Sequence, residues 1–386
     1  MLTRAQKRQK RDDGLWEVIV NNDDVCFVHI LPKLNQTDVK FLFEVNAETR
    51  ALIKRSSRKD DLERYFKVEE MKSISALEFA WNNMPWGTEI PCDSVGRILL
   101  DQNYFCSEVA RTGKLELLKW AREEKNCEWN EWTSQAAAYA GNLEMQKYCV
   151  ANSCPIDKFA CAGAAYGGHL ESLKYLREVM KAPWDSETAK LAAEGGHLHI
   201  LEYLVERKYD KYDIRACSFA AKNGDLKCLK FLHETAKAPW DERTAEFAAR
   251  GGHLHILEYL VRCGYHKYYE KVCAEAAGGG HLDCLKHLHE EVKAPWDEDT
   301  AARAADGGHL HILEYLVARK YDAFDIESCR RATRNGHIDC LKYLHEVVKA
   351  PLDATTIRIA YSNEEPECLQ YLLKETDCPR PTSWWI

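Results

Sequence analysis

The sequence predicts an all-α protein built as a helical-repeat solenoid, with a small helical module before it. The stretch Trp240–Pro295 recurs almost unchanged from Trp184 and again from Trp296, a spacing of 56 residues. Inside each copy a Gly followed by His or Asp occurs twice, 28 residues apart, as at His253 and His281. Apolar residues after each such pair fall at helical spacing. Self-similarity at a fixed period of this size indicates a stacked array of one supersecondary unit.

Each repeat is predicted to be a pair of short helices. Asp241 is a suitable N-cap for the first helix, because its carboxylate can accept hydrogen bonds from the free amides that open a helix. The small Ala248-Ala249 pair allows close packing, and Gly251-Gly252 supplies the left-handed residue that commonly ends a helix. From Leu254 to Val261 apolar residues occupy one face, which indicates an amphipathic second helix.

Such units must stack in series, because two helices of about ten residues cannot bury their apolar faces alone. The solenoid is predicted to span residues 72–378, followed by a tail at 379–386. It is expected to open with a lone second helix at residues 73–81 and a loop at 82–95. Glu364 replaces the glycine of the last repeat, as suits a polar end cap. The preceding repeats carry the marker glycines Gly113, Gly141, Gly168, Gly196, Gly224, Gly252, Gly280, Gly308 and Gly336.

The unit resembles the ankyrin repeat in its Ala-Ala first helix, its Gly-His-Leu turn and its Leu-rich second helix. The usual Thr-Pro-Leu-His is reduced to forms such as Glu-Arg-Thr-Ala at residues 242–245, and the period is shorter than the usual ~33 residues. The resemblance implies a shortened ankyrin-type solenoid that binds protein. The shortening is expected in the hairpin fingers between repeats, so binding through such fingers does not carry over.

The composition indicates a globular chain without a membrane span. The chain has 386 residues, 46% of them hydrophobic, and a net charge of -8. No apolar run approaches about 18 residues and no signal peptide is recognisable, so an intracellular location, cytoplasmic and/or nuclear, is expected. The 16 cysteines follow the repeat, as at Cys217, Cys273 and Cys329, which indicates reduced thiols in small buried sites.

The N-terminal part lacks the repeat pattern. Residues 1–13 are polar and basic and are predicted to form a disordered tail. A nuclear-import signal is the alternative interpretation, since import receptors read short Lys/Arg runs. Residues 14–71 are predicted to form two or three short helices, a separate small module.

The module at residues 14–71 resembles an F-box at the apolar positions of its helices. It departs from that motif where Asn22-Asp23 replaces Leu-Pro and where Thr49 replaces Trp. The resemblance implies docking to the Skp adaptor of a cullin-type ubiquitin ligase, with the solenoid selecting the client protein. The alternative is a helical cap that closes the first apolar face of the solenoid. The residues expected to bind protein are Phe27, Ile30, Leu31, Leu34, Val39, Leu42 and Val45.

No residue pattern supports catalysis, a cofactor or a metal. His281 and Cys284 lie one helical turn apart, but the sister copy has Asp225 and Cys228, and a structural zinc site needs four ligands. The His after Gly is better explained as a hydrogen-bonding turn residue. The sequence contains no Gly-rich phosphate loop, GxSxG or HExxH. We therefore expect a protein that is not an enzyme and that holds no cofactor.

Charged residues occupy one position of successive second helices, and from Lys174 onward their signs alternate. Neighbouring helices pack about 8–10 Å apart, so these side chains could form a ladder of surface ion pairs that sets the register of the stack. The alternative is a by-product of duplicating a two-repeat block. The series is Lys119, Lys147, Lys174, Glu202, Lys230, Glu258, Lys286, Glu314 and Lys342.

Aromatic residues recur in the loops of alternate repeats, where they are predicted to project from one rim and to bind protein. The alternative is that one aromatic of each loop packs back onto the helices. Trp184, Trp240 and Trp296 lie in the other loops and are expected to be structural plugs between repeats. The predicted rim residues are Tyr209, Tyr212, Tyr265, Tyr268, Tyr321 and Phe324.

Nucleic acid and membranes are not expected partners. The position after Ala-Ala carries both signs, as in Glu194, Lys222 and Asp306, whereas phosphate binding needs a continuous basic stripe. The sequence therefore predicts a monomeric protein–protein interaction adaptor. It would act either as the substrate-recognition subunit of a cullin-type ubiquitin ligase or as a plain scaffold whose N-terminal helices serve only as a cap.

Overall fold

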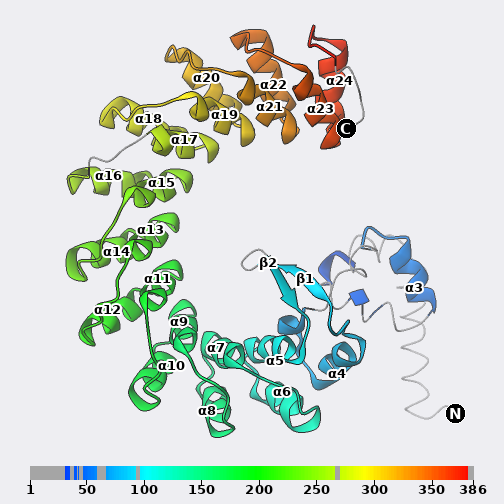
Figure 1. Cartoon of the computed structure of the whole chain (residues 1–386), viewed down its shortest axis with the longest axis vertical. Coiled ribbons are helices and arrows are strands. Elements are labelled where there is room, and N and C mark those ends of the chain that lie inside the picture. Colours follow the sequence, from blue (N-terminus) through cyan, green and yellow to red (C-terminus); the bar gives the residue numbers. More distant parts are fainter. Residues whose placement is uncertain are drawn as a thin grey trace, which may run out of the picture. The chain divides into compact units, whose positions relative to one another are not determined.

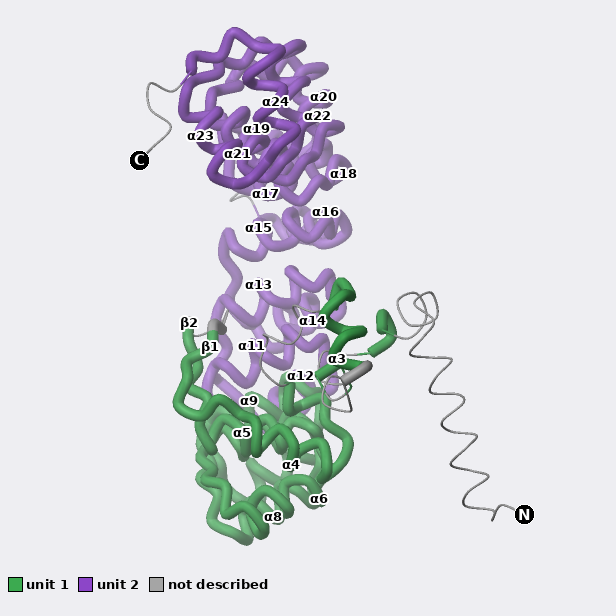
Figure 2. The backbone as a smooth tube through the Cα atoms, turned by 90° about the vertical axis from the view of Figure 1, so that its right-hand side faces the viewer, with its two compact units in different colours: residues 1–183 green, residues 184–386 purple. Residues whose placement is uncertain are grey.

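The computed structural model describes residues 31–34, 39–40, 42, 47–58, 67–92, 96–265 and 270–380. They belong to two compact units, residues 1–183 and 184–386, which Figure 2 colours separately. The boundary between the units falls inside the predicted solenoid. The basic segment at residues 1–13, with both of its interpretations, lies outside the described residues.

The first unit continues from short elements into paired helices (Figure 1). Its opening elements are η2 (Leu31–Lys33), α3 (Ala47–Lys54), η4 (Val68–Glu70), α4 (Ile74–Asn83), β1 (Glu89–Cys92) and β2 (Gly96–Leu99). The helix pairs that follow are α5 (Gln102–Arg111) with α6 (Leu115–Lys119) and η5 (Trp120–Glu124), α7 (Glu131–Tyr139) with α8 (Leu143–Ala151), and α9 (Lys158–Tyr166) with α10 (Leu170–Lys174) and η6 (Tyr175–Val179).

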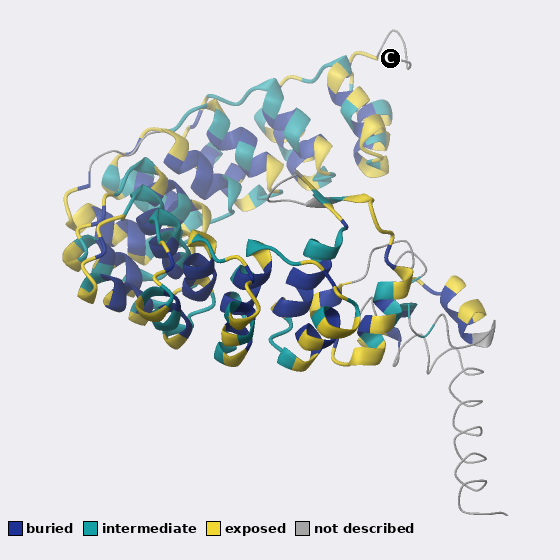
Figure 3. Cartoon of the chain, turned by 60° about the horizontal axis from the view of Figure 1, so that its bottom comes forward, coloured by how far each residue is buried: buried dark blue, intermediate teal, exposed yellow. Residues whose placement is uncertain are grey.

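The second unit consists of successive helix pairs, and in Figure 3 the buried residues of each pair lie where helices face their neighbours. The first four pairs are α11 (Ser186–Glu194) with α12 (Leu198–Glu206), α13 (Ile214–Lys222) with α14 (Leu226–Lys230) and η7 (Phe231–Thr235), α15 (Glu242–Arg250) with α16 (Leu254–Arg262), and α17 (Glu270–Gly278) with α18 (Leu282–Lys286) and η8 (His287–Val292). The others are α19 (Glu298–Asp306) with α20 (Leu310–Ala318), α21 (Ile326–Arg334) with α22 (Ile338–Tyr343) and η9 (Leu344–Val348), and α23 (Ala354–Ser362) with α24 (Pro366–Lys374). The predicted helical-repeat architecture is confirmed.

The prediction of a loop at residues 82–95 is wrong in part, because β1 and β2 form an antiparallel hairpin there. Ile90 pairs with Ile98 across the hairpin. Ile90 also packs against the core of the first unit, which contains Leu100 and Phe105. Ile90 and Ile98 are β-branched, a residue type that is favoured in strands. The lone second helix expected at residues 73–81 is present as α4.

The first helix of each repeat begins and packs as its sequence predicts. In α15 the Asp241 carboxylate accepts a hydrogen bond from the amide of Arg243 at 3.1 Å. Ala248 and Ala249 are fully buried, where α15 packs between α13 and α17. Small side chains therefore set the close spacing of the first helices.

The Gly-Gly-His turn is a contact between successive repeats. Gly252 ends α15 with a φ of 72°. A Cβ atom on Gly252 would lie 2.5 Å from Nδ1 of His281, the turn histidine of the next repeat. Nε2 of the equivalent His253 forms a hydrogen bond of 3.0 Å with the carbonyl oxygen of Lys222. The expected role of this histidine as a hydrogen-bonding turn residue is confirmed.

Alternate repeats differ in how their second helix ends, and this is why the obvious period is twice the length of one repeat. In α14, α18 and α22 the helix continues into a π-helical turn, whereas α12, α16 and α20 have none. The ring of Trp296 follows η8 and stacks on His289, with 3.4 Å between ring centroids. The expected role of this Trp as a plug between repeats is confirmed.

Apart from the exposed Cys263, the cysteines of the described repeats are buried free thiols. Cys217, Cys273 and Cys329 are fully buried. Burial raises the pKa of the Cys273 thiol to about 12, so the thiol stays protonated. The predicted role as small buried thiols is confirmed.

We expect glycine at the ends of α12 and α20 to stabilise the protein. Lys208 and Lys320 hold left-handed backbone there, with φ of 55° and 60°, where the equivalent residue after α16 is Gly264. Because L side chains disfavour this region, Lys208→Gly and Lys320→Gly should each raise the free energy of unfolding by ~0.5–1 kcal/mol, after the larger unfolded-state entropy of glycine is subtracted. Urea unfolding measures this difference. Gly264→Lys should act in the opposite direction, and a loss of stability in all three variants would contradict the account.

The protein should lose stability as the pH falls below about 6.5. Burial lowers the pKa of His233, His289 and His309 from 6.5, so these side chains bind protons more readily in the unfolded chain. Their contribution to stability is complete above the unfolded pKa and is lost as the pH falls. Thermal melts at about pH 7.5 and about pH 5.5 should show the lower Tm in acid. His289→Phe keeps a ring on Trp296 and should reduce this difference; an unchanged difference would exclude His289 as a contributor.

Candidate protein-binding surface

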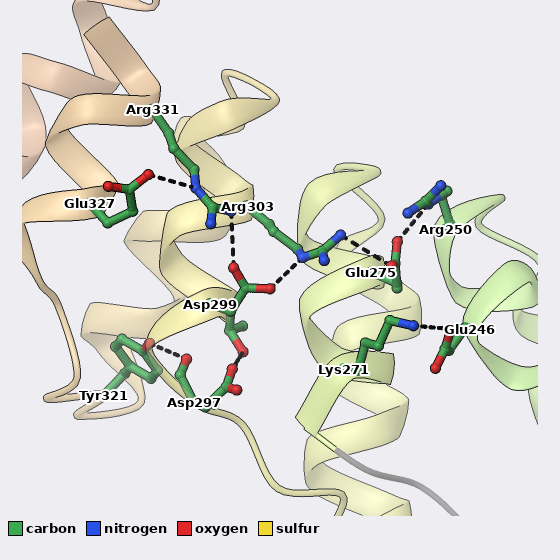
Figure 4. Close-up of polar contacts among 11 residues, drawn as sticks. Glu246, Arg250, Lys271, Glu275, Asp297, Asp299, Arg303, Tyr321, Glu327 and Arg331 are labelled. Carbon is green, nitrogen blue, oxygen red and sulfur yellow. Dashed lines mark hydrogen bonds and ion pairs between the residues drawn. The ribbon is translucent and has the colours of Figure 1, made fainter. Parts of the chain in front are cut away.

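The first aromatic residue of each predicted rim loop is packed back onto the helices. Tyr209, Tyr265 and Tyr321 are only 6%, 7% and 6% exposed. The hydroxyl of Tyr321 donates to the carbonyl oxygen of Asp297, 24 residues earlier, as Figure 4 shows. These three tyrosines therefore join neighbouring repeats and offer little surface to a partner.

The second aromatic residue of the loops is also partly covered. Tyr212 and Phe324 are half-buried, and each meets the preceding tyrosine edge-on with ring centroids 4.8 Å apart. Burial raises the pKa of Tyr212. Tyr268 lies outside the described residues. The first aromatic residue of each loop thus packs back onto the helices, as the alternative interpretation expected. Protein binding by the rim residues stays a prediction, and the aromatic surface they expose is smaller than expected.

The N-terminal module has a small apolar cluster of its own. Leu31, Val39 and Ile53 are buried together, and Leu34 and Leu42 pack partly buried against them. Of the residues predicted to bind protein here, Leu31 and Val39 are thus core residues of the module, whereas Leu34 and Leu42 keep some exposure. The other predicted residues lie outside the described residues: Phe27, Ile30 and Val45.

Exposed aromatic side chains gather instead on the first helices α7 and α9 of the first unit. Trp132 and Phe159, at the second position of the two helices, are 48% and 39% exposed. Tyr166, at the ninth position of α9, is 40% exposed and stacks on the equivalent Tyr139 at 5.6 Å. We call Trp132, Tyr139, Phe159 and Tyr166 the aromatic face.

Small residues separate the two rows of the aromatic face. Ala136 and Gly163 are buried between them. A Cβ atom on Gly163 would lie 2.7 Å from the carbonyl oxygen of Gln135, so only glycine allows the two helices to approach this closely. Small side chains therefore lie between the row formed by Trp132 and Phe159 and the row formed by Tyr139 and Tyr166.

Cations border the aromatic face. The guanidinium of Arg111 lies 5.3 Å from the ring centroid of Tyr139, and the ammonium of Lys158 lies 5.1 Å from that of Phe159. Such cation–π contacts help to hold the two rings in place. The sequence signal for this surface is an aromatic residue at the second and ninth positions of consecutive first helices. The sequence analysis considered only the aromatic residues in the loops of later repeats and so missed this signal.

The first helices of the second unit carry a network of charges, shown in Figure 4. Glu275 is buried, with 5% of its side chain exposed, between Arg250 at 2.5 Å and Arg303 at 3.1 Å. Arg303 also pairs with Asp299 at 2.5 Å, which pairs in turn with Arg331 at 2.9 Å. Opposite charges thus tie α15, α17, α19 and α21 together in series.

The ion-pair ladder predicted for the second helices is wrong. No ion pair joins the alternating Lys and Glu series within the described part of the chain. Lys230 lies instead over the ring of Tyr259 at 5.5 Å, and Lys286 lies over Tyr315 at 5.9 Å. The lysine thus contacts the ring of the tyrosine beside Glu258, and Glu258 is exposed to water.

Among the described residues, no three His, Cys, Asp or Glu side chains are grouped so that they could hold a metal ion. No helix in the same residues has the length and apolar character needed to cross a bilayer.

Comparison with known proteins supports the ankyrin resemblance over part of the chain. The family model "Ankyrin repeats (many copies)" matches residues 217–261, which run from α13 to α16. No curated protein matches the chain. The match covers a segment in which the Ala-Ala and Gly-His-Leu motifs both occur.

Among solved structures, the chain is similar to the pentatricopeptide repeat protein PPR10 in complex with an 18-nt psaJ RNA element. The identity is 11% and the TM-score 0.39, with 95% of this chain and 60% of that chain covered. PPR10 from maize gives 12% identity and a TM-score of 0.35, covering 96% and 64%. The chain thus spans less than two thirds of the length of these proteins.

Proposed function

We propose that this protein is a helical-repeat scaffold that binds a partner polypeptide on the aromatic face of α7 and α9. The observation that carries the proposal is the exposure of Trp132, Phe159 and Tyr166 on adjacent helices of a rigid array. Tyr and Trp are enriched in the centres of protein interfaces, where they supply large contact areas at a low entropic cost. Exposed apolar surface that is grouped in this way commonly marks an interaction site.

The position of the rings favours protein as the ligand. All four belong to first helices, and α7 packs against both α5 and α9. The residues between the rows are small and uncharged, and the two cations already contact rings. A net charge of -8 disfavours binding of a polyanion by general attraction. An extended or helical segment with apolar side chains fits such a surface.

Alanine substitutions on the aromatic face test the proposal. Proteins captured by the full chain from nuclease-treated lysate would be identified, and their affinities measured for Trp132→Ala and Tyr166→Ala. Each substitution should lower the affinity of the same partner by about tenfold or more. Tyr361→Ala is the matched control, since Tyr361 is an aromatic residue on α23 that is 53% exposed.

Equal binding by all variants, or loss of binding only in the control, would contradict this location of the site. Circular dichroism should show unchanged helix content, because the substituted side chains are largely exposed. Capture that disappears on nuclease treatment would also count against a polypeptide partner.

We further propose that the N-terminal module docks the Skp adaptor of a cullin-type ubiquitin ligase, which would make the chain a substrate-recognition subunit. The support is the F-box resemblance and the presence of one apolar cluster around Leu31, Val39 and Ile53. Co-purification with the Skp adaptor tests it. Leu34→Asp and Leu42→Asp should abolish the complex, since both side chains are only half-buried. A chain that never co-purifies with the adaptor would be the plain scaffold, with the module acting as a cap.

A further inference from the structure

A Trp side chain plugs the end of the π-helical turn in the middle of the second unit. The indole of Trp296 stacks on the imidazole of His289, with ring centroids 3.4 Å apart and planes 10° apart. The ring of Tyr321 meets the indole edge-on at 5.6 Å, and the Tyr321 hydroxyl donates to the carbonyl oxygen of Asp297. The equivalent His and Trp rings one block earlier stack at 3.7 Å. The plug is therefore a repeated structural device.

The residues that surround this plug are retained 56 positions later, in the last two-repeat block. His345 occupies the place of the stacking histidine and is half-buried. Lys349, which ends η9, has a φ of 62°, the value of its equivalent Lys293. The hydroxyl of Tyr371 donates to Glu346 at 2.9 Å, as the equivalent tyrosine does one block earlier. The backbone and the outer side chains are thus arranged as if an aromatic plug were still present.

The rings themselves are replaced in the last block. Leu352 stands where the sequence period places Trp, and Asp377 where it places Tyr. The thiol of Cys378 takes over the hydrogen bond of the lost tyrosine and donates to the carbonyl oxygen of Asp353 at 3.1 Å. A hollow of about 260 Å³ lies here, lined by His345, Leu352 and Cys378 with Lys349, Ala350, Asp377 and Pro379. Its volume exceeds the cavity of about 150 Å³ that binds benzene in an engineered protein core.

We propose that this hollow is an indole-binding site, and that the chain's own segment at residues 380–386 fills it with Trp384 or Trp385. Pro379 lines the hollow, and the two Trp residues follow it after five and six positions. An extended chain spans up to about 3.3–3.6 Å per residue, so a turn within this segment is short enough to bring an indole back. The indole would stack on the imidazole of His345, whose Nδ1 is hydrogen-bonded to the Tyr371 hydroxyl at 2.8 Å.

The chain's own segment is a more favourable ligand than a side chain of another protein, because its effective concentration at the hollow is higher. A short connection to Pro379 keeps both Trp residues at an effective concentration in the millimolar range. Free tryptophan side chains on other proteins do not reach that concentration. The indole also matches the chemistry of the position, because the same ring type fills it in the preceding blocks.

Hydrogen–deuterium exchange of the full chain tests the proposal. The amides of residues 380–386 should exchange at least about tenfold more slowly than in a synthetic peptide of the same sequence. Leu352→Trp fills the hollow from within and should abolish this protection. Trp384→Ala/Trp385→Ala should lower the Tm of the otherwise unchanged chain, yet have no effect when Leu352→Trp is present. Trp132→Ala, which removes an exposed Trp from the first unit, is the control and should leave the protection unchanged.

A measurement without a core substitution provides a second test. In the Trp384→Ala/Trp385→Ala chain, added N-acetyltryptophanamide should shift the ring resonances of His345, and in the unchanged chain it should not. Exchange of residues 380–386 at the free-peptide rate in the unchanged chain would overturn the proposal. Protection that disappears on tenfold dilution would replace it by docking between two copies of the chain.

Discussion

Replacing Gly252 by alanine is expected to lower the free energy of unfolding by ~2–4 kcal/mol. Two costs add at this position. The φ of 72° disfavours any residue with a Cβ atom. That Cβ would also lie 2.5 Å from the ring of His281, which must then move and lose its packing. Urea unfolding of the full chain measures the sum.

Gly196→Ala separates the two costs. Gly196 has nearly the same φ, 71°, but faces Asp225, and its added Cβ would lie 3.4 Å from the carboxylate. This variant should therefore lose only the conformational part, ~1 kcal/mol. The difference between the two variants is the contact with the imidazole.

A second substitution should rescue the first. His281→Asp gives this turn the residue that Asp225 provides in its own repeat, where the carboxylate caps α14 through the amides of Lys227 and Cys228 at 3.0 Å. In that background Gly252→Ala should cost no more than Gly196→Ala. If its cost stays at the higher value, the clash with His281 is not the cause.

The repeat and its ends were predictable because they depend on local chemistry. An Asp such as Asp241 caps a helix and a Gly such as Gly252 ends one, so the sequence of a single repeat predicts where its first helix begins and ends. The double Ala of the first helix predicts close packing in the same way. Each of these features requires only the residue, its neighbours in the chain and the period.

The features that sequence reasoning missed depend on which side of a helix meets its neighbour. Lys230 and Glu258 share a position in the repeat, yet the ammonium of Lys230 lies over the ring of Tyr259, 5.5 Å from its centroid. The aromatic face was missed for a related reason: Trp132 and Tyr166 fall at positions that later repeats fill with charged residues. Periodicity predicts equivalence between repeats and does not show where one repeat has acquired a surface of its own.

Glu275→Gln is expected to destabilise the protein by ~1–3 kcal/mol, because it leaves two guanidinium groups without their shared carboxylate. The side chain of Glu275 is 5% exposed, and its oxygens contact Arg250 and Arg303 from the repeats before and after. Those arginines are 58% and 29% exposed, so water can solvate part of the released charge. The loss should therefore stay below the ~3–5 kcal/mol that is typical when a fully buried pair is broken.

Glu327→Gln is the matched control, since Glu327 belongs to the same network with 33% of its side chain exposed. This substitution should cost only ~0–1 kcal/mol. High salt should remove the effect of the control and retain most of the effect at Glu275, because buried pairs are screened less. A double-mutant cycle with Arg303→Gln should show coupling, as the two side chains touch at 3.1 Å. Equal losses for both glutamates, or losses that salt removes alike, would mean that the first helices are held by apolar packing alone. Coupling that persists in salt would show that opposite charges on successive first helices also set the register of this stack.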